Sequence, residues 1–198
     1  MGTYIRELRK FERRIPKGGP TITLSGLSCS GKTSVAEYLA KKLGLDFVDA
    51  GGGFWRSIAK ERGLDLDKLS KTAEKSIDIE MDKRTLELAQ KGGAVLMGRL
   101  VAWAAGDHAD FRVMLTASPP ERAKRSAGRD RISIQKARQL VKNRDEQDRK
   151  RYLKYYGIDL FDYSVYNLVL DTSRLDLNQV QQIVFDIVKK SLASASNT

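Results

Sequence analysis

Residues 26–33 read Gly-Leu-Ser-Cys-Ser-Gly-Lys-Thr and match the spacing G-x-x-x-x-G-K-[ST] at every fixed position. In such loops, consecutive backbone N–H groups and the lysine ammonium surround phosphates, and the last hydroxyl can bind Mg²⁺. The flanks agree, because residues 21–24 alternate like a strand and apolar residues recur at helical spacing from 35 to 43. We therefore predict a phosphate-binding loop at a helix N-terminus. The alternative, a chance turn rich in Gly and Ser, requires the motif and both flanks to coincide.

The chain carries a large excess of positive charge. Its 198 residues include 36 Lys and Arg against 25 Asp and Glu, a formal net charge of +11. Such a charge favours acidic partners, whether nucleic acid, an anionic membrane surface or small phosphorylated substrates. The length predicts one domain. Because no apolar stretch approaches the length that crosses a bilayer and no apolar signal region is present, we expect a cytoplasmic protein with no membrane partner.

The only cysteine, Cys29, lies inside the phosphate loop. No internal disulfide is therefore possible. Its position favours a small residue that contributes to phosphate binding through its backbone and not through its thiol. A redox role is the less favoured alternative.

Most of the basic residues lie in two regions. In residues 1–17, apolar side chains recur at roughly helical spacing among six basic ones, and Pro and Gly residues at 16–20 end the pattern. This predicts a short amphipathic helix within a basic N-terminal extension, residues 1–20. We favour an accessory helix or loose arm, with an arm that binds nucleic acid or another partner as the alternative. At the other end, we expect a flexible tail over residues 192–198.

The second basic region runs from residue 121 to 154. Thirteen Lys and Arg outnumber five acids there, and tyrosines enter only at its end. Aromatic residues spread through the patch would favour single-stranded nucleic acid. Arginine dominates instead, which suits the binding of small phosphates.

The order of the predicted elements indicates an α/β fold. Strands alternate with helical segments, so we expect a parallel sheet that helices cover on both faces. Ligands of such sheets bind beyond the carboxyl ends of the strands, which here carry residues 26–33, 49–53, 98–99 and 171–173. The expected strands are residues 21–24, 46–49, 94–97, 111–115 and 167–170, and the helices after the second strand are residues 54–62 and 77–91.

These motifs, in this order, resemble the cytidylate kinases, most closely the archaeal-type branch of the nucleoside monophosphate kinases. The resemblance extends from about residue 21 to residue 188. It is carried by the phosphate loop, Phe-Val-Asp-Ala-Gly at 47–51, Gly-Arg-Leu at 98–100 with Trp103, Tyr-Tyr-Gly-Ile-Asp at 155–159 and Asp-Thr-Ser-Arg at 171–174. The phosphate-loop motif alone occurs in many nucleotide-binding families, whereas the later segments are much more specific for the cytidylate kinases.

The resemblance implies a three-layer α/β/α P-loop kinase fold with a five-stranded parallel sheet, in a single domain over residues 21–191. It also implies a helical monophosphate-binding segment at about 52–92 and an arginine-rich lid within about 121–154. Such a protein uses ATP and Mg²⁺, transfers the γ-phosphoryl group to CMP or dCMP to give CDP or dCDP and ADP, and is expected to be a monomer. Two alternatives are a kinase of the same fold for UMP, AMP or a small alcohol, and a basic ATP-dependent RNA- or ribosome-associated binding protein.

The resemblance also implies roles for single residues. The catalytic group is Lys32, Arg99, Arg144 and Arg151. The residues that bind ATP are Gly26, Leu27, Ser28, Cys29, Ser30, Gly31, Lys32, Thr33 and Ser34. The residues that bind the acceptor are Asp49, Gly51, Arg56, Arg99, Arg144, Asp148 and Arg151. Thr33 and, through water, Asp49 are the ligands of Mg²⁺.

Some of these basic residues have a second interpretation. Arg144, Asp148 and Arg151 share one face of a helix and match an R-D-x-x-D-x-x-R pattern of related kinases, but they also fit a solvated ion-pair stripe. For Arg122, Arg125 and Arg129, contact with ATP and ordinary helix-surface charge are equally favoured.

Two positions depart from the family pattern. Three other residues, one histidine and two tryptophans, are predicted to have structural roles and no part in a functional site. Arg56 comes one residue later than the usual arginine, a rotation of about 100° on a helix, and Met97 stands where an acid is frequent. We expect His108, between Asp107 and Asp110, to be a surface residue, and Trp55 and Trp103 to be core aromatics.

Overall fold

A computed structural model of the chain describes residues 18–63 and 75–195. The side chains of residues 55, 56, 59, 75, 76 and 195 also lie outside the description. The amphipathic helix expected near the N-terminus therefore falls outside the described residues. Among those residues, no helix combines the length and the apolar character that a membrane span requires.

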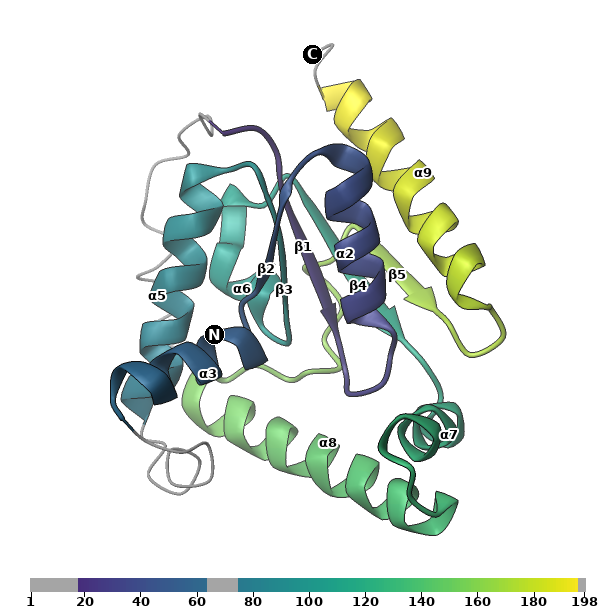
Figure 1. The fold of residues 1–198 in the computed structure, drawn as a ribbon. Coiled ribbons are helices and arrows are strands. Elements are labelled where there is room, and N and C mark those ends of the chain that lie inside the picture. Colours follow the sequence, from purple (N-terminus) through teal and green to yellow (C-terminus); the bar gives the residue numbers. More distant parts are fainter. Residues whose placement is uncertain (1–17, 64–74, 196–198) are drawn as a thin grey trace.

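A five-stranded parallel sheet forms the centre of the structure (Figure 1). Its spatial order is β2-β3-β1-β4-β5, so the strand before the phosphate loop, β1, lies in the middle. All six residues of β1 are buried, as expected of a strand that helices cover on both faces. The strands are β1 (Thr21–Gly26), β2 (Asp46–Asp49), β3 (Ala94–Gly98), β4 (Phe111–Thr116) and β5 (Leu168–Asp171).

Helices cover both faces of the sheet and complete the three predicted layers. On one face, α2 (Lys32–Leu43) and α9 (Leu177–Ala195) pack side by side (Figure 1), and their apolar residues form the main core with β1, β3 and β4. On the other face, α5 (Lys75–Lys91) and α6 (Val101–Ala105) build a second cluster that contains Ala89, Leu96 and Ala105. The short helix η1 (Gly106–His108) follows α6 and packs against α5.

Three more helices lie at the carboxyl edge of the sheet, near the phosphate loop (Figure 1). They are α3 (Gly52–Glu61), α7 (Pro119–Asp130) and the long α8 (Ile134–Tyr156). Ser118 and Ser133 cap α7 and α8 by accepting from backbone N–H groups three residues on, and Gly157 ends α8 at φ +66°. Tyr152 and Tyr156 hold the C-terminal end of α8 in a third apolar cluster with Leu27, Leu100 and Trp103.

The predicted fold class, the five strands and their parallel order are confirmed. The strands extend one or two residues beyond most predicted ends, and α3 begins at Gly52. Helix α9 continues through Ala195, so residues 192–195 of the expected tail are helical. Trp103 is buried as expected.

One expectation was wrong. His108 is only 7% exposed, because η1 packs against α5 instead of projecting into solvent.

Candidate functional site

The phosphate loop has the backbone of an anion cradle. Gly26 must be glycine, since a Cβ there would clash with Ser30 Oγ and lie 2.8 Å from the carbonyl oxygen of Leu115. Gly31 precedes α2 with φ +92°, and Cys29 takes φ +62°, a left-handed conformation that is uncommon for a residue with a side chain. No side chain caps α2, which leaves the N–H groups of its first turn pointing into the loop.

Lys32 is held over this loop as a poorly compensated cation. Its Nζ donates to the carbonyl oxygen of Leu27 at the long distance of 3.4 Å. Burial and, after it, the positive charges of Arg99 and Arg144 lower the pKa of Lys32 to about 8, while Cys29 and Asp49 act in the opposite direction. Bound phosphate oxygens would supply the missing negative charge, so the position fits a polyphosphate.

Arg99 joins the phosphate loop to α8. It follows β3 directly and is mostly enclosed, with a side chain that is 17% exposed. One guanidinium nitrogen donates to Ser28 Oγ at 2.9 Å, and Nε lies 2.8 Å from Asp148 Oδ2. A planar guanidinium in this place can contact an anion on the loop and a second anion beside α8.

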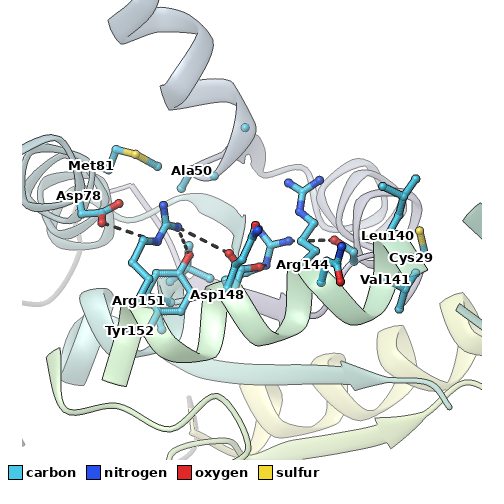
Figure 2. Close-up of a pocket in the computed structure, with 18 of the residues that line it drawn as sticks. Cys29, Ala50, Asp78, Met81, Leu140, Val141, Arg144, Asp148, Arg151 and Tyr152 are labelled. Carbon is cyan, nitrogen blue, oxygen red and sulfur yellow. Dashed lines mark hydrogen bonds and ion pairs between the residues drawn. The ribbon is translucent and has the colours of Figure 1, made fainter. Parts of the chain in front are cut away.

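Opposite charges continue from Arg99 along the cavity. Arg151 lies 3.8 Å from Asp148 and 3.9 Å from Asp78 of α5, and it donates to the hydroxyl of Tyr152 at 2.8 Å (Figure 2). In the described part of the chain, Nε of Arg99, Nε of Arg151 and Oδ2 of Asp148 are buried without a well-aligned hydrogen bond. Buried polar atoms normally have such partners. A polar ligand bound along this row of charges would supply them.

These side chains line one cavity of about 690 Å³. The phosphate loop and the turn from β2 into α3 form one side, and α5, α7 and α8 contribute the others. Figure 2 shows Arg144 and Cys29 near one end and Asp78 and Met81 near the other. The cavity is large enough for a small polar ligand beside the loop.

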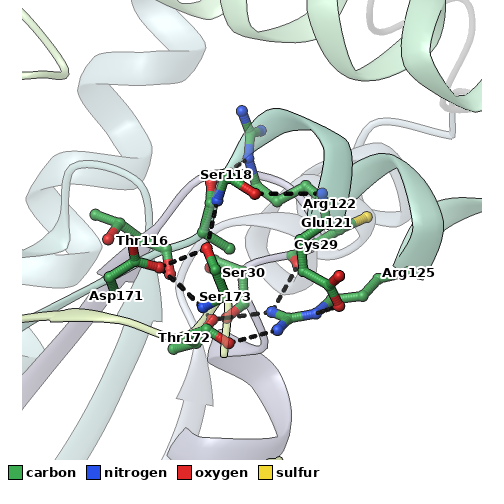
Figure 3. A network of polar contacts seen from close by, with 11 residues as sticks. Cys29, Ser30, Thr116, Ser118, Glu121, Arg122, Arg125, Asp171, Thr172 and Ser173 are labelled. Carbon is green, nitrogen blue, oxygen red and sulfur yellow. Dashed lines mark hydrogen bonds and ion pairs between the residues drawn. The ribbon is translucent and has the colours of Figure 1, made fainter. Parts of the chain in front are cut away.

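Two arginines of α7 hold the phosphate loop from its outer side. Arg122 is 2% exposed and forms a two-pronged contact with Asp145 of α8, at 2.6 and 3.0 Å. Arg125 donates to the carbonyl oxygen of Thr172 at 2.7 Å, to its Oγ1 at 2.9 Å and to the carbonyl oxygen of Cys29 at 3.5 Å (Figure 3). Neither is ordinary helix-surface charge; both connect separate segments around the loop.

Arg129 differs from its two neighbours on α7. It is exposed and paired with Asp130 at 2.8 Å, and both residues line the cavity. It is therefore the α7 arginine with access to a ligand.

The remaining predicted residues flank the loop. Asp49 ends β2 beside Met97, and its Oδ1 accepts from the N–H of Gly51 at 3.2 Å. Met97 is 4% exposed within β3, where a carboxylate of the family pattern would stand. Thr33 is exposed in the first turn of α2. Among the described residues, no three His, Cys, Asp or Glu side chains group as metal ligands, so a cation here would be held mainly by other oxygens.

Arg56 lies in α3, at the edge of the site, but its side chain is outside the described residues. The predicted contact of Arg56 with the acceptor therefore stays a prediction. The structure does bring Arg99, Arg144, Asp148 and Arg151 around one cavity with residues of the loop. Lys32 lies near enough to Arg99 and Arg144 for their charges to act on it.

The predicted monophosphate-binding segment, about 52–92, includes α5, but none of the α5 residues that line the cavity was predicted as a site residue. Asp78, Met81, Asp82 and Thr85 line the cavity at positions i, i+3, i+4 and i+7 of one helix face. The two acids at i and i+4 were a usable signal for this wall. Tyr152 and Tyr156 of α8 also line the cavity.

Comparison with known proteins agrees with this geometry. The model of the "cytidylate kinase-like family" matches residues 21–174. A cytidylate kinase of Pyrococcus abyssi is 42% identical over 180 residues, covering 90% of this chain and 96% of that protein. A cytidylate kinase of Staphylothermus marinus is 41% identical over 173 residues, covering 86% and 97%.

A solved structure shares the fold at lower identity. Shikimate kinase from Acinetobacter baumannii, in complex with shikimate, matches with a TM-score of 0.60 and 17% identity, covering 87% of this chain and 94% of that one. At this identity the likeness concerns the fold alone, whereas the family match and the archaeal relatives span most of the sequence. The chain belongs to the cytidylate kinase-like family.

Proposed function

We propose that the protein is an ATP-dependent kinase that transfers the γ-phosphoryl group to CMP or dCMP, giving CDP or dCDP and ADP. The observation that carries this proposal is the position of Arg99, which contacts Ser28 of the phosphate loop and Asp148 of α8. One guanidinium thus connects a triphosphate site with a second polar site in the same cavity. The archaeal relatives named cytidylate kinases support the choice of acceptor.

The residues of the chain act mainly by positioning and by neutralising charge. Transfer between phosphates requires little covalent help, because the attacking and leaving oxygens need only to be aligned and their charge stabilised. The amides of residues 26–34 hold the α- and β-phosphates of ATP, and Lys32 contacts the outer phosphates. Arg99 lies where the transferred group passes between the two nucleotides.

The acceptor monophosphate is assigned to the arginines of α8 and to the turn after β2. Arg144 and Arg151 line the cavity on either side of Asp148. Their guanidinium groups suit the phosphate, and the Asp148 carboxylate suits a ribose hydroxyl. We assign Asp49, Gly51 and Arg56 to the acceptor as well; of these three, Gly51 lines the cavity.

The residues beside the loop fit Mg²⁺ with most of its water retained. The Thr33 hydroxyl and the Asp49 carboxylate are hard oxygen donors, and Mg²⁺ commonly keeps several waters beside one or two protein ligands. Bound there, Mg²⁺ would neutralise charge on the phosphate oxygens. With buried Met97 in place of an acid, we assign no third protein ligand.

Helices α7 and α8 form the proposed lid, which excludes water from the transferred group. We propose a monomeric, cytoplasmic enzyme of pyrimidine nucleotide metabolism. Other acceptors and an RNA-associated role are less favoured, because the site is built for two small phosphates and the relatives are named cytidylate kinases.

An acceptor panel tests the proposal. The full chain is incubated with ATP, Mg²⁺ and each of CMP, dCMP, UMP, AMP, shikimate and gluconate, and ADP formation is measured in a coupled assay. We expect the highest kcat/KM with CMP or dCMP. No ADP formation with any nucleoside monophosphate would refute the kinase assignment, and salt-sensitive RNA binding without turnover would favour the RNA-associated alternative.

The pKa of Lys32 predicts proton uptake when ATP binds above pH 8. In the free chain this pKa is lowered to about 8 by burial and by Arg99 and Arg144, so the ammonium loses its proton above that pH. Bound phosphates raise the pKa again, so the complex holds more protons than the free chain and affinity falls as pH rises, by up to about tenfold per pH unit.

Calorimetry in buffers of different ionisation enthalpy measures this uptake. We expect nearly one proton per ATP at about pH 9 and much less at about pH 7.5. The Lys32→Met variant is the control and should show no such rise. Equal uptake by the variant and the natural chain would assign the proton to another group.

A further inference from the structure

The end of the cavity formed by α5 carries two acids. Asp78 and Asp82 are one helical turn apart on the face that lines the cavity. Asp78 is buried and faces Arg151, as Figure 2 shows. This wall is thus chemically opposite to the phosphate loop.

The position of the acids assigns them to the nucleoside part of an acceptor. The row of contacts begins at Ser28 and passes through Arg99, Asp148 and Arg151 before it reaches Asp78. Carboxylates repel a phosphate, which the arginines nearer the loop would attract. An acceptor whose phosphate lies at these arginines therefore extends its other end toward α5.

The oxygens of Asp78 and Asp82 can accept hydrogen bonds from a ligand. The positive charge of Arg151 does not fully offset the burial of these two carboxylates. The hydroxyl of Tyr156 is hydrogen-bonded to Asp82. Burial and the charge of Asp78 nevertheless raise the pKa of Asp82 to about 7, with burial as the larger cause. Burial also raises the pKa of Asp78, although Arg151 opposes the shift. A ligand that donates hydrogen bonds here would satisfy both groups.

We propose that Asp82, assisted by Asp78, determines base specificity by accepting a hydrogen bond from an exocyclic amino group of the acceptor's base. The inference rests on the proposed function. Cytosine presents its amino group at the position where uracil presents a carbonyl oxygen. The ionised Asp82 carboxylate, which is the main form above about pH 7, binds the first and repels the second. Asp82 has the larger role, since Arg151 already lies 3.9 Å from Asp78.

The Asp82→Asn variant tests this role in the full chain. An amide can donate to the uracil oxygen, so the variant accepts either base. We expect the ratio of kcat/KM for CMP to that for UMP to fall about 10- to 100-fold, the value of one hydrogen bond to a charged group. Asp78→Asn should lower the ratio less. Glu87→Gln, an exposed acid of the same helix, is the matched control and should leave the ratio unchanged.

Binding measurements separate this inference from the proposed function. Titration calorimetry with CMP and UMP in the absence of ATP gives the same ratio without turnover. If the natural chain transfers no phosphoryl group but binds CMP more tightly than UMP, and Asp82→Asn removes that preference, the kinase assignment falls and the inference stands. Equal losses for both nucleotides in Asp82→Asn, or no preference in the natural chain, would overturn the inference.

Discussion

The Lys32→Met variant should keep its fold and lose about 10²–10³-fold in kcat, the usual effect of removing one preorganised electrostatic group. The ammonium contacts the oxygens on which charge develops during transfer, and methionine fills a similar volume without charge. The ligand-free variant should melt no lower than the natural chain, because burial and two neighbouring arginines already disfavour the ammonium and hold its pKa at about 8.

Single-turnover measurements with saturating ATP and CMP give the rate of the chemical step, and calorimetric scans give Tm. The matched control is Lys41→Met, which changes an exposed lysine of the same helix. It should alter neither quantity appreciably. A Lys32→Met variant with the natural rate of transfer would show that the loop holds its phosphates without this side chain.

Local sequence signals were sufficient for the fold and for the phosphate loop. The loop motif and the flanking periodicities depend on residues close in sequence, and the strand and helix that they predict on either side of the loop are confirmed. The α8 residues were also accessible, because Arg144, Asp148 and Arg151 are spaced to share one helix face. These predictions required no knowledge of how distant segments pack.

The missed features depend on such packing. Arg122 is buried because Asp145, on the next helix, lies at 2.6 Å from its guanidinium, and no local pattern specifies that pairing. His108 lies in a segment with two acids that resembles an exposed turn, yet η1 is buried against α5. Asp82 acquires its role only when α5 meets α8, where the Tyr156 hydroxyl is hydrogen-bonded to Asp82 and both residues line the cavity.

The Arg99→Ala variant should lose about 10³-fold in kcat/KM for the acceptor. Arginines at this point of a phosphoryl-transfer site neutralise charge on the transferred group, and loss of one commonly costs at least this factor. The same substitution removes the ion pair with buried Asp148 at 2.8 Å, which leaves Arg151, 3.8 Å away, as the cation beside that carboxylate. We therefore also expect a loss of about 2–3 kcal/mol in the free energy of unfolding.

Arg99→Lys separates the two effects. An ammonium can still compensate Asp148, so most of the stability should return, but it lacks the planar fork that reaches both Ser28 and α8. Activity should stay about 10²-fold below the natural chain. The control is Arg138→Ala, an exposed arginine of α8 that lines a separate depression with Phe161. If Arg99→Lys restores turnover along with stability, Arg99 acts on the fold of the site and the direct contact with the transferred group is excluded.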